Sequence, residues 1–227
     1  MSAGRVSAKI RVEVKDEKGR TVKVIEEKTR SFTQTFATLL VASQFYTPDV
    51  PQLGFYDAIG TYFGTGYNAN PVMLYVIGVP QQLFCADSCP LLPIYANAVI
   101  SSPGIWLGTN QCSVTYTSFG PCAVIPLGVL SPGPFNFTRS VAQGQGGWLL
   151  QFSQTWTNVS NSTVNVGSVA LVLAAVGTTI QCFQGCPASW SPGEYFLYSL
   201  IVDNINPSVT LNPGWYITVT YTITFQV

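Results

Sequence analysis

The sequence predicts an all-β fold: an antiparallel β-sandwich of the jelly-roll kind, with an N-terminal β-hairpin and one short helix. Two observations lead to this prediction. From Pro48 onward the chain consists of short β-branched and aromatic runs, broken repeatedly by Gly, Pro, Asn and Ser. The C-terminal run WYITVTYTITFQV alternates hydroxyl and apolar side chains with a period of two, as a half-buried strand does. Many short strands separated by turn signals and long loops favour a sandwich, with a jelly roll as the leading topology.

Residues 5–28 alternate like two strands around the turn sequence KDEKGR. Gly19 supplies the positive φ that a tight turn requires. Because an isolated two-stranded hairpin is only marginally stable, this one must pack on another surface. Two alternatives stay open: the hairpin joins the sheet of its own chain, or it docks into a neighbouring subunit. The apolar positions expected to share one face are Val6, Ile10, Val12, Val14, Val22 and Val24.

The next segment, SFTQTFATLLVASQFY at 31–46, places apolar residues at helical spacing. It predicts a short amphipathic helix that begins at Ser31 or Thr33 and ends before the next proline. The expected organisation is a charged docking element at 1–46 and a sandwich body at 47–227, with loops rich in Cys, Pro and Gly. The apolar stripe of the helix consists of Phe32, Phe36, Leu39, Leu40 and Phe45.

The strands of the body are placed by their β-branched and aromatic runs. They are expected near residues 72–77, 98–100, 114–117, 123–125, 135–142, 148–158, 164–176, 195–202 and 215–227.

Charge is concentrated in the first thirty residues, which hold nine cations and five acids. The rest of the chain keeps Arg139 as its one cation, with five acids. Phosphate binding needs several cations on one surface, so no nucleic-acid partner is expected. Histidine is absent from the chain, which removes imidazole bases and histidine-dependent nucleophiles. The acids are scattered singly, so we expect neither an enzyme nor a bound cofactor.

The most apolar stretch, residues 164–176, is shorter than the roughly 20 residues that cross a bilayer as a helix. It is rich in valine and predicts buried strand, so no membrane span is expected. The N-terminus leads into charged residues and not into an apolar run, so no secretory signal is expected.

Six cysteines fall into three local pairs within Pro- and Gly-rich segments. An even, paired count in loops favours disulfides, and hence an oxidising exterior or a hyperthermophile. Zinc is the alternative, because two C-x3-C hooks offer four thiolates. The spacing leaves the connectivity open, and no metal ligand is assigned. The disulfide candidates are Cys85, Cys89, Cys112, Cys122, Cys182 and Cys186.

Three sequons make Asn136, Asn158 and Asn161 candidates for N-glycosylation. The second and third lie together in the turn-like sequence NVSNST between two strong strands. A glycan placed there would project into solvent if the protein is displayed on a surface.

Five sequence features occur in one order: a charged hairpin with a D-x-x-G turn, a Phe-containing amphipathic stretch, I-G-T-x-x-G-T-G, W-x-x-x-F-x-x-T-W-T-N and N-P-G-x-x-x-T-V-T-Y-T-I-T-F. In this order they resemble the small β-sandwich virion structural proteins of tailed phages and of hyperthermophilic archaeal viruses. The matching segments are residues 14–21, 32–45, 59–66, 148–158 and 212–225. The chain departs from these proteins at Val164–Ala170, where an acidic residue and a Gly-Leu are often found.

The resemblance implies a non-enzymatic virion structural protein of an archaeal virus from a hot acidic environment. Such a subunit would stand at a vertex, turret, spike or tail on the virion surface, docked through its N-terminus. At about pH 2 to 3, carboxylates are protonated while Lys and Arg stay charged. A body with few ionisable groups avoids lost ion pairs and positive self-repulsion, so its stability should change little with pH.

Two other functions remain open at this point. One is a subunit of an extracellular filament or cell-surface layer that assembles by strand addition. The other is a carbohydrate-binding virion module for host attachment, because sugars stack on aromatic faces such as those at 54–63 and 187–196. The expected partners are other virion or filament subunits, including copies of the chain in a homo-oligomer, and a host-surface glycan for the third function.

Overall fold

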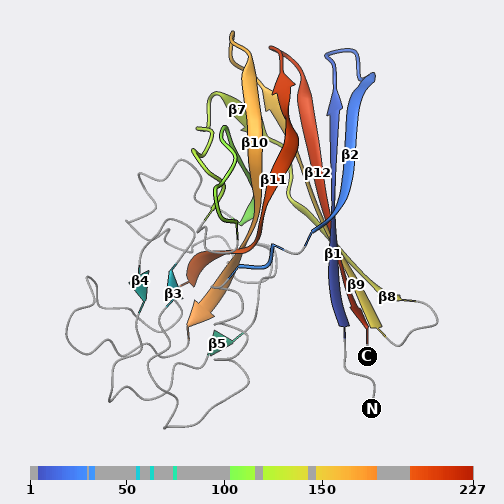
Figure 1. The fold of residues 1–227 in the computed structure, drawn as a ribbon, viewed down its shortest axis with the longest axis vertical. Coiled ribbons are helices and arrows are strands. Elements are labelled where there is room, and N and C mark those ends of the chain that lie inside the picture. Colours follow the sequence, from blue (N-terminus) through green and yellow to red (C-terminus); the bar gives the residue numbers. More distant parts are fainter. Residues whose placement is uncertain are drawn as a thin grey trace.

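The computed structural model describes residues 5–29, 31–33, 55–56, 62–63, 74–75, 103–115, 120–142, 147–177 and 195–226. These residues form two antiparallel sheets packed face to face, and a small sheet of β3 (Phe55–Tyr56) and β4 (Tyr62–Phe63) (Figure 1). The prediction of an all-β antiparallel sandwich is therefore confirmed. The jelly-roll order stays a prediction. The helix expected at 31–46 lies outside the described residues except for 31–33, which are extended.

The larger sheet has six strands in the order β2-β1-β12-β9-β7, and β8 also pairs with β9. All of its pairings are antiparallel. Its strands are β1 (Arg5–Lys15), β2 (Thr21–Thr29), β7 (Leu130–Pro132), β8 (Asn136–Ala142), β9 (Gly147–Asn158) and β12 (Tyr216–Gln226).

The smaller sheet has four strands in the order β11-β10-β5, with β6 also paired to β10. Strand β10 is its centre and is buried on both faces from Val166 as far as Leu173. The strands are β5 (Leu74–Tyr75), β6 (Gly104–Gly108), β10 (Val164–Gly177) and β11 (Tyr195–Leu211).

The N-terminal hairpin belongs to the sheet of its own chain. Strand β1 pairs with the C-terminal strand β12 along its whole length, from Arg5 opposite Gln226 to Lys15 opposite Tyr216. It also supplies four buried side chains to the core. Residues 5–29 thus contribute two strands to the larger sheet and side chains to the core. The four buried side chains are Ala8, Ile10, Val12 and Val14.

The hairpin turn is organised by Asp16. Its Oδ1 accepts from the backbone N–H groups of Lys18 at 3.0 Å and Arg20 at 2.9 Å. Its Oδ2 accepts from Arg20 Nε at 2.7 Å. Gly19 has a φ of +79°, as predicted. These bonds satisfy the backbone donors that a turn would otherwise leave to water.

The turn sets a strand register in which the two faces of the hairpin differ from the predicted ones. Lys15 pairs with Thr21, and a β-bulge next to this pair shifts the register of the remaining pairs, so that Val24 lies opposite Glu13. Val22 and Val24 are 51% and 45% exposed, while the buried Val12 has Ile25 as its neighbour. The prediction that Val22 and Val24 share the apolar face of β1 was wrong, because a one-residue shift moves a side chain to the other face.

The core lies between the two sheets, and polar side chains cross it to join them. Trp156 of β9 donates its Nε1–H to Ile105 O of β6 at 2.7 Å. Gln154 Oε1 accepts from Ile105 N at 2.7 Å. The amide and indole groups are thereby satisfied inside an apolar core, where an unpaired polar group would cost about 1–3 kcal/mol. The largest fully buried side chains are Trp156, Tyr221 and Phe152, and Trp106 also belongs to the core.

Several strand boundaries differ from the expected ones. Strand β11 continues nine residues beyond 202, past Asn206 and Pro207. Strands β6 and β7 were not anticipated. Of the expected strand at 123–125, the structure has a single bridge, between Val124 and Gly108. The expected strand at 98–100 lies outside the described residues, and the described part of 114–117 is not a strand.

Candidate functional site

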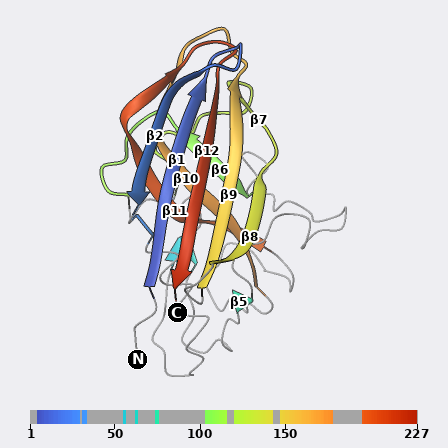
Figure 2. The ribbon, with the colours of Figure 1, turned by 90° about the vertical axis from the view of Figure 1, so that its right-hand side faces the viewer.

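The outer face of the larger sheet divides into two chemically different halves. Figure 2 looks onto this face, and no described strand crosses in front of it. The register of the strands determines which side chains point outward, since they lie opposite to the buried ones. We call the half formed by β1 and β2 the hairpin face, and its residues are Lys9, Arg11, Glu13, Lys15, Val24, Glu26 and Lys28. We call the other half the hydroxyl face, and its residues are Asn136, Thr138, Ser140, Gln151, Ser153, Thr155, Thr157, Thr218, Thr220, Thr222 and Thr224, together with the half-buried Leu149 and Tyr216.

Ion pairs connect the side chains of the hairpin face. Arg11 lies 3.5 Å from Glu13 and 3.6 Å from Glu26, and Lys15 lies 3.3 Å from Glu13. A hydrogen bond from the Thr21 hydroxyl lowers the pKa of Glu13, and Lys15 and Arg11 add to this effect. All these groups are solvent-exposed or partly so, and such pairs contribute little to stability. Because these ion pairs contribute little to stability, their charged groups can contribute to recognition of another surface.

Two exposed valines accompany these charges. Val22 and Val24 lie on β2 beside the ion pairs. The hairpin face with Val22 thus combines charged side chains with two exposed apolar ones.

The hydroxyl face contains no charged residue. Neighbouring hydroxyls bond to each other, as Thr155 Oγ1 and Thr218 Oγ1 do at 2.8 Å. Threonine keeps β propensity because it is branched, and it offers water a hydroxyl in place of a charge. The prediction that the threonines of β12 occupy the face opposite to Ile217, Val219 and Tyr221 is confirmed.

The edge of β2 that pairs with no described strand carries features that oppose pairing with another chain. Lys23 and Glu27 lie on the core-facing side of this edge strand, opposite Val14 and Ile10. Lys23 Nζ reaches across to the carbonyl oxygens of Pro207 at 3.4 Å and Ser208 at 3.5 Å. Inward-pointing charges and a β-bulge are devices by which natural sheets prevent edge-to-edge association.

The other described edges of the larger sheet carry similar features. Strand β7 is three residues long and ends at Pro132. On edge strand β8, Arg139 lies on the core-facing side, opposite Leu150, and its guanidinium sits 5.0 Å from the ring centroid of Trp148. Short strands, proline and inward-pointing charge all disfavour strand addition.

The edges of the smaller sheet are covered or interrupted. Beside β6, Ile125 N donates to Leu107 O at 2.9 Å. Beside β11, Val202 N donates to Ser31 O at 3.2 Å and Thr33 N to Leu200 O at 3.1 Å. These bonds occupy backbone groups that an incoming strand would need.

The two sheets meet at a buried polar cluster formed by Thr29, Asp203 and Tyr221. The Asp203 side chain belongs to β11, and its Oδ1 accepts a hydrogen bond from the Thr29 hydroxyl at the end of β2. Asp203 is 7% exposed and Tyr221 of β12 is fully buried. Within the described part of the chain, Asp203 Oδ2 and the Tyr221 hydroxyl oxygen lie outside hydrogen-bonding geometry with any partner.

The pKa values of the cluster follow from its burial. Desolvation raises the pKa of Asp203, and the hydroxyls of Thr29, Ser31 and Tyr221 act in the opposite direction. The negative charge of Glu27 raises it further. Burial, with the nearby Asp203 carboxyl, raises the pKa of Tyr221 well above its ordinary value. In both groups burial thus shifts the ionisation equilibrium toward the neutral form.

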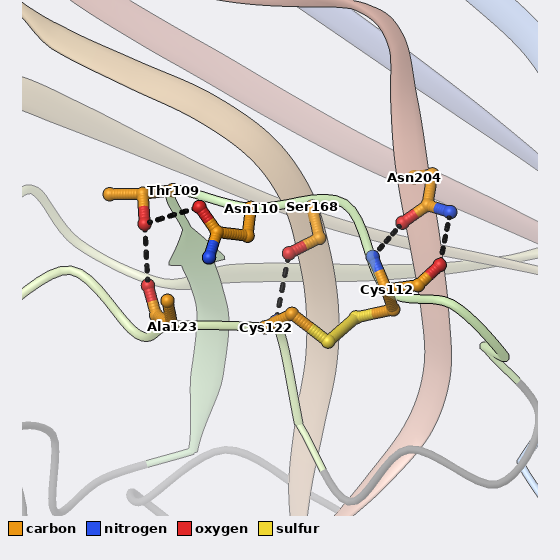
Figure 3. The surroundings of a disulfide bond; sticks show 7 residues. All are labelled: Thr109, Asn110, Cys112, Cys122, Ala123, Ser168 and Asn204. Atoms are coloured by element: carbon orange, nitrogen blue, oxygen red, sulfur yellow. Dashed lines mark hydrogen bonds between the residues drawn. A yellow bond between two sulfur atoms is a disulfide. The ribbon is translucent and has the colours of Figure 1, made fainter.

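Two of the predicted cysteines are joined, since Cys112 and Cys122 form a disulfide (Figure 3). Its loop is held against the smaller sheet: Ser168 Oγ accepts from Cys122 N at 2.9 Å. Gly108 and Gly167 leave the room for this close approach, because a Cβ at either would meet loop atoms within 3 Å. The loop therefore covers one face of the smaller sheet. The other candidates, Cys85, Cys89, Cys182 and Cys186, lie outside the described residues.

The three candidate glycosylation sites differ in environment. Asn158 is 1% exposed, and its Nδ2 donates to Ser162 O at 2.8 Å and Leu211 O at 2.9 Å. The amide nitrogen that would receive a glycan is thus engaged inside the fold. Asn136 and Asn161 are both exposed, and the structure leaves both more accessible than Asn158.

Within the described ranges, no group of three or more His, Cys, Asp and Glu residues could hold a metal ion. The same ranges contain no helix of the length and apolarity needed to cross a membrane. What the described residues do offer is two exposed surfaces of distinct chemistry and one buried titratable cluster.

Comparison with known proteins adds no relative to this description. No protein-family model, curated protein or solved structure matches the chain at a significant level.

Proposed function

We propose that the protein is a non-enzymatic structural subunit on the surface of an archaeal virus particle from a hot acidic environment. The observation that carries the proposal is the division of the outer face of the larger sheet. Charges and exposed valines gather on β1 and β2, and uncharged hydroxyls and amides cover β12, β9 and β8. One half suits a contact with another subunit, and the other suits an acidic exterior. A jelly-roll order for the complete chain, and assembly as a homo-oligomer, are part of this proposal.

The hydroxyl face matches what exposure to acid requires. Carboxylates with ordinary pKa values are neutral at about pH 2 to 3, so surface ion pairs are lost there. Hydroxyls and amides keep their hydrogen bonds to water and to each other over this range. Protein surface made of such groups changes neither charge nor hydration when the pH changes.

The hairpin face is proposed as the docking surface, through which the N-terminal part of the chain meets the rest of the particle. Its ion pairs retain their strength where a neighbouring subunit excludes the exterior solvent, and Val22 and Val24 supply apolar contact. Docking thus uses the outer face of the hairpin, because the inner face is already committed to the core of the chain.

Polymerisation by strand addition, as in a filament or surface layer, receives less support. It requires an open sheet edge, and the described edges carry inward charges, prolines or covering segments. For the carbohydrate-binding alternative, the aromatic stretches at 54–63 and 187–196 fall largely outside the described residues, so that function stays a prediction.

Location in particles tests the proposal. Immunogold labelling and cryo-electron microscopy of particles released by cells that carry the gene are expected to show the protein on the particle exterior. Finding it only in filaments or surface layers of uninfected cells would contradict the proposal and favour the alternative.

A matched pair of variants tests the docking surface. Val24→Asp introduces an acid in the hairpin face, and Ser153→Asp introduces the same acid in the hydroxyl face. Both side chains point away from the core, so each should cost less than about 1 kcal/mol of stability. Only Val24→Asp is expected to lower incorporation into particles. Equal incorporation of both variants, with both folded by circular dichroism, contradicts docking through the hairpin face.

A further inference from the structure

The buried cluster of Thr29, Asp203 and Tyr221 lies where the chain passes from one sheet to the other. Thr29 ends β2 in the larger sheet, and residues 31–33 then run along β11 of the smaller sheet. Phe32 forms a bridge with Ile201, two residues before Asp203. Tyr221 projects into the core from β12 of the larger sheet. The carboxyl of Asp203 thus lies at this seam, where it accepts a hydrogen bond from Thr29 and lies near the Tyr221 hydroxyl.

The surroundings of Asp203 suit a neutral acid better than an anion. The carboxyl is buried, and the charged residue that acts on it from β2 is Glu27, which is itself negative. Its other neighbours are the hydroxyls of Thr29 at the end of β2, Ser31 in the segment after β2 and Tyr221 of β12. A buried carboxylate without a cationic partner is costly, and proteins relieve the cost by keeping it protonated.

We propose that Asp203 is an acid-operated latch between the two sheets, closed when its carboxyl is protonated and loosened when it ionises. In the closed form Oδ1 accepts a hydrogen bond from the Thr29 hydroxyl. Oδ2, which carries the proton, turns it toward the Tyr221 hydroxyl oxygen, so that both unpartnered atoms become satisfied. Ionisation releases this proton to solvent and leaves an anion in apolar surroundings near Glu27.

The sign of the pH dependence follows from the raised pKa of Asp203. Between the unfolded value near 3.8 and the higher folded value, the folded chain binds more protons than the unfolded chain. Stability therefore falls as the pH rises through this window, and the contribution of the latch is complete below the unfolded value. This is opposite to the behaviour of Asp16, whose pKa is lowered by the backbone N–H of Arg20 and by the Arg20 side chain.

Urea unfolding from about pH 3 to about pH 8 tests the latch in the full chain, with wild type and Asp203→Asn compared. The amide of the variant matches the shape of the neutral acid, accepts from Thr29 and can donate to Tyr221. Above the unfolded value of 3.8, the urea midpoint of wild type is expected to fall with rising pH. The variant is expected to match wild type in acid, exceed it at the alkaline end and lose most of this fall.

Two further measurements distinguish the effect of Asp203 ionisation on stability from the effects of other titratable groups. Asp16→Asn should leave the alkaline fall intact, because the contribution of Asp16 is lost in acid. In wild type with 13C-labelled aspartate, the Asp203 carboxyl should titrate above 3.8, and amide protection of Thr33 and Val202 should weaken over the same range. An Asp203 carboxyl that titrates at or below 3.8, or an unchanged pH slope in Asp203→Asn, would overturn the proposal.

Discussion

The side-chain amide of Asn204 pairs with the backbone of Cys112 as a neighbouring strand would. Asn204 Oδ1 accepts from Cys112 N at 2.7 Å, and Asn204 Nδ2 donates to Cys112 O at 2.8 Å (Figure 3). Cys112 is buried, so its backbone groups have little access to water. One side chain of β11 thereby fixes the position of the disulfide loop on the smaller sheet.

Asn204→Ala should destabilise the fold by about 1–3 kcal/mol, because it leaves a buried N–H and a buried C=O unpaired. Asn165→Ala is the matched control, since Asn165 lies on the same sheet but makes an exposed hydrogen bond to Thr210. It should cost less than about 0.5 kcal/mol. Urea unfolding at a fixed pH checks both values, and equal losses in the two variants would contradict the role of Asn204.

Removing the Cys112–Cys122 disulfide should cost roughly 2–3 kcal/mol, as expected for a short closed loop. The double variant Cys112→Ala and Cys122→Ala tests this without altering the other cysteines. Because Asn204 and Ser168 still hold the loop, the variant should keep the native circular dichroism spectrum. Any further loss when reductant is added to the variant would report on the remaining four cysteines. A variant as stable as wild type would show that hydrogen bonds alone fix the loop.

Gly108→Ala should be more costly than its size suggests. A Cβ there would overlap Cys122 O and lie 2.6 Å from Ser168 Oγ, so the loop would have to move. Overpacking of this kind costs about 1–3 kcal/mol. Gly128→Ala is the control: it has open space around it but a φ of +94°, and left-handed strain should cost about 1 kcal/mol. Thermal unfolding distinguishes the two, and a smaller loss at Gly108 would contradict the close packing of the loop.

The sequence predicted those features in which local pattern and tertiary environment agree. The alternation of β12 and the run that forms β9 were placed almost to the residue. Strand β11 runs beyond its predicted end at 202, past Asn206 and Pro207, and its position at a sheet edge tolerates the proline. Strand β6 was missed because GIWLG is short and bounded by glycines, of which Gly108 admits the disulfide loop.

The candidate sites were less accessible to prediction because they depend on pairing between distant strands. In the sequence, Asp203 is a single acid within an apolar run. Nothing in that pattern predicts that Thr29 and Tyr221 will enclose it. The outward face of Val24 depends on a bulge that the turn sequence does not specify. For Asn158, the sequon pattern is visible in the sequence, whereas its engagement by Leu211 O is not.

Asn158 connects three strand ends by hydrogen bonds. The asparagine of this sequon therefore has a structural role. Besides its two donated bonds, its Oδ1 accepts from Ser160 N at 3.0 Å and Ser160 Oγ at 2.7 Å. Its backbone carbonyl accepts from Gly214 N at 2.9 Å. The residue therefore links the end of β9 with its following turn, with the end of β11 and with the turn before β12.

Asn158→Asp should destabilise the fold by about 3 kcal/mol at neutral pH, because an anionic oxygen would replace the donor that faces the carbonyls of Ser162 and Leu211. Part of the loss should return in acid, where the new carboxyl is protonated and can donate one bond. Asn161→Asp, at the exposed neighbouring sequon, should change stability by less than about 0.5 kcal/mol. Peptide mass spectrometry of the native protein should accordingly find any glycan at Asn136 or Asn161. A glycan at Asn158, or equal stability of the two variants, would contradict the buried role of its amide.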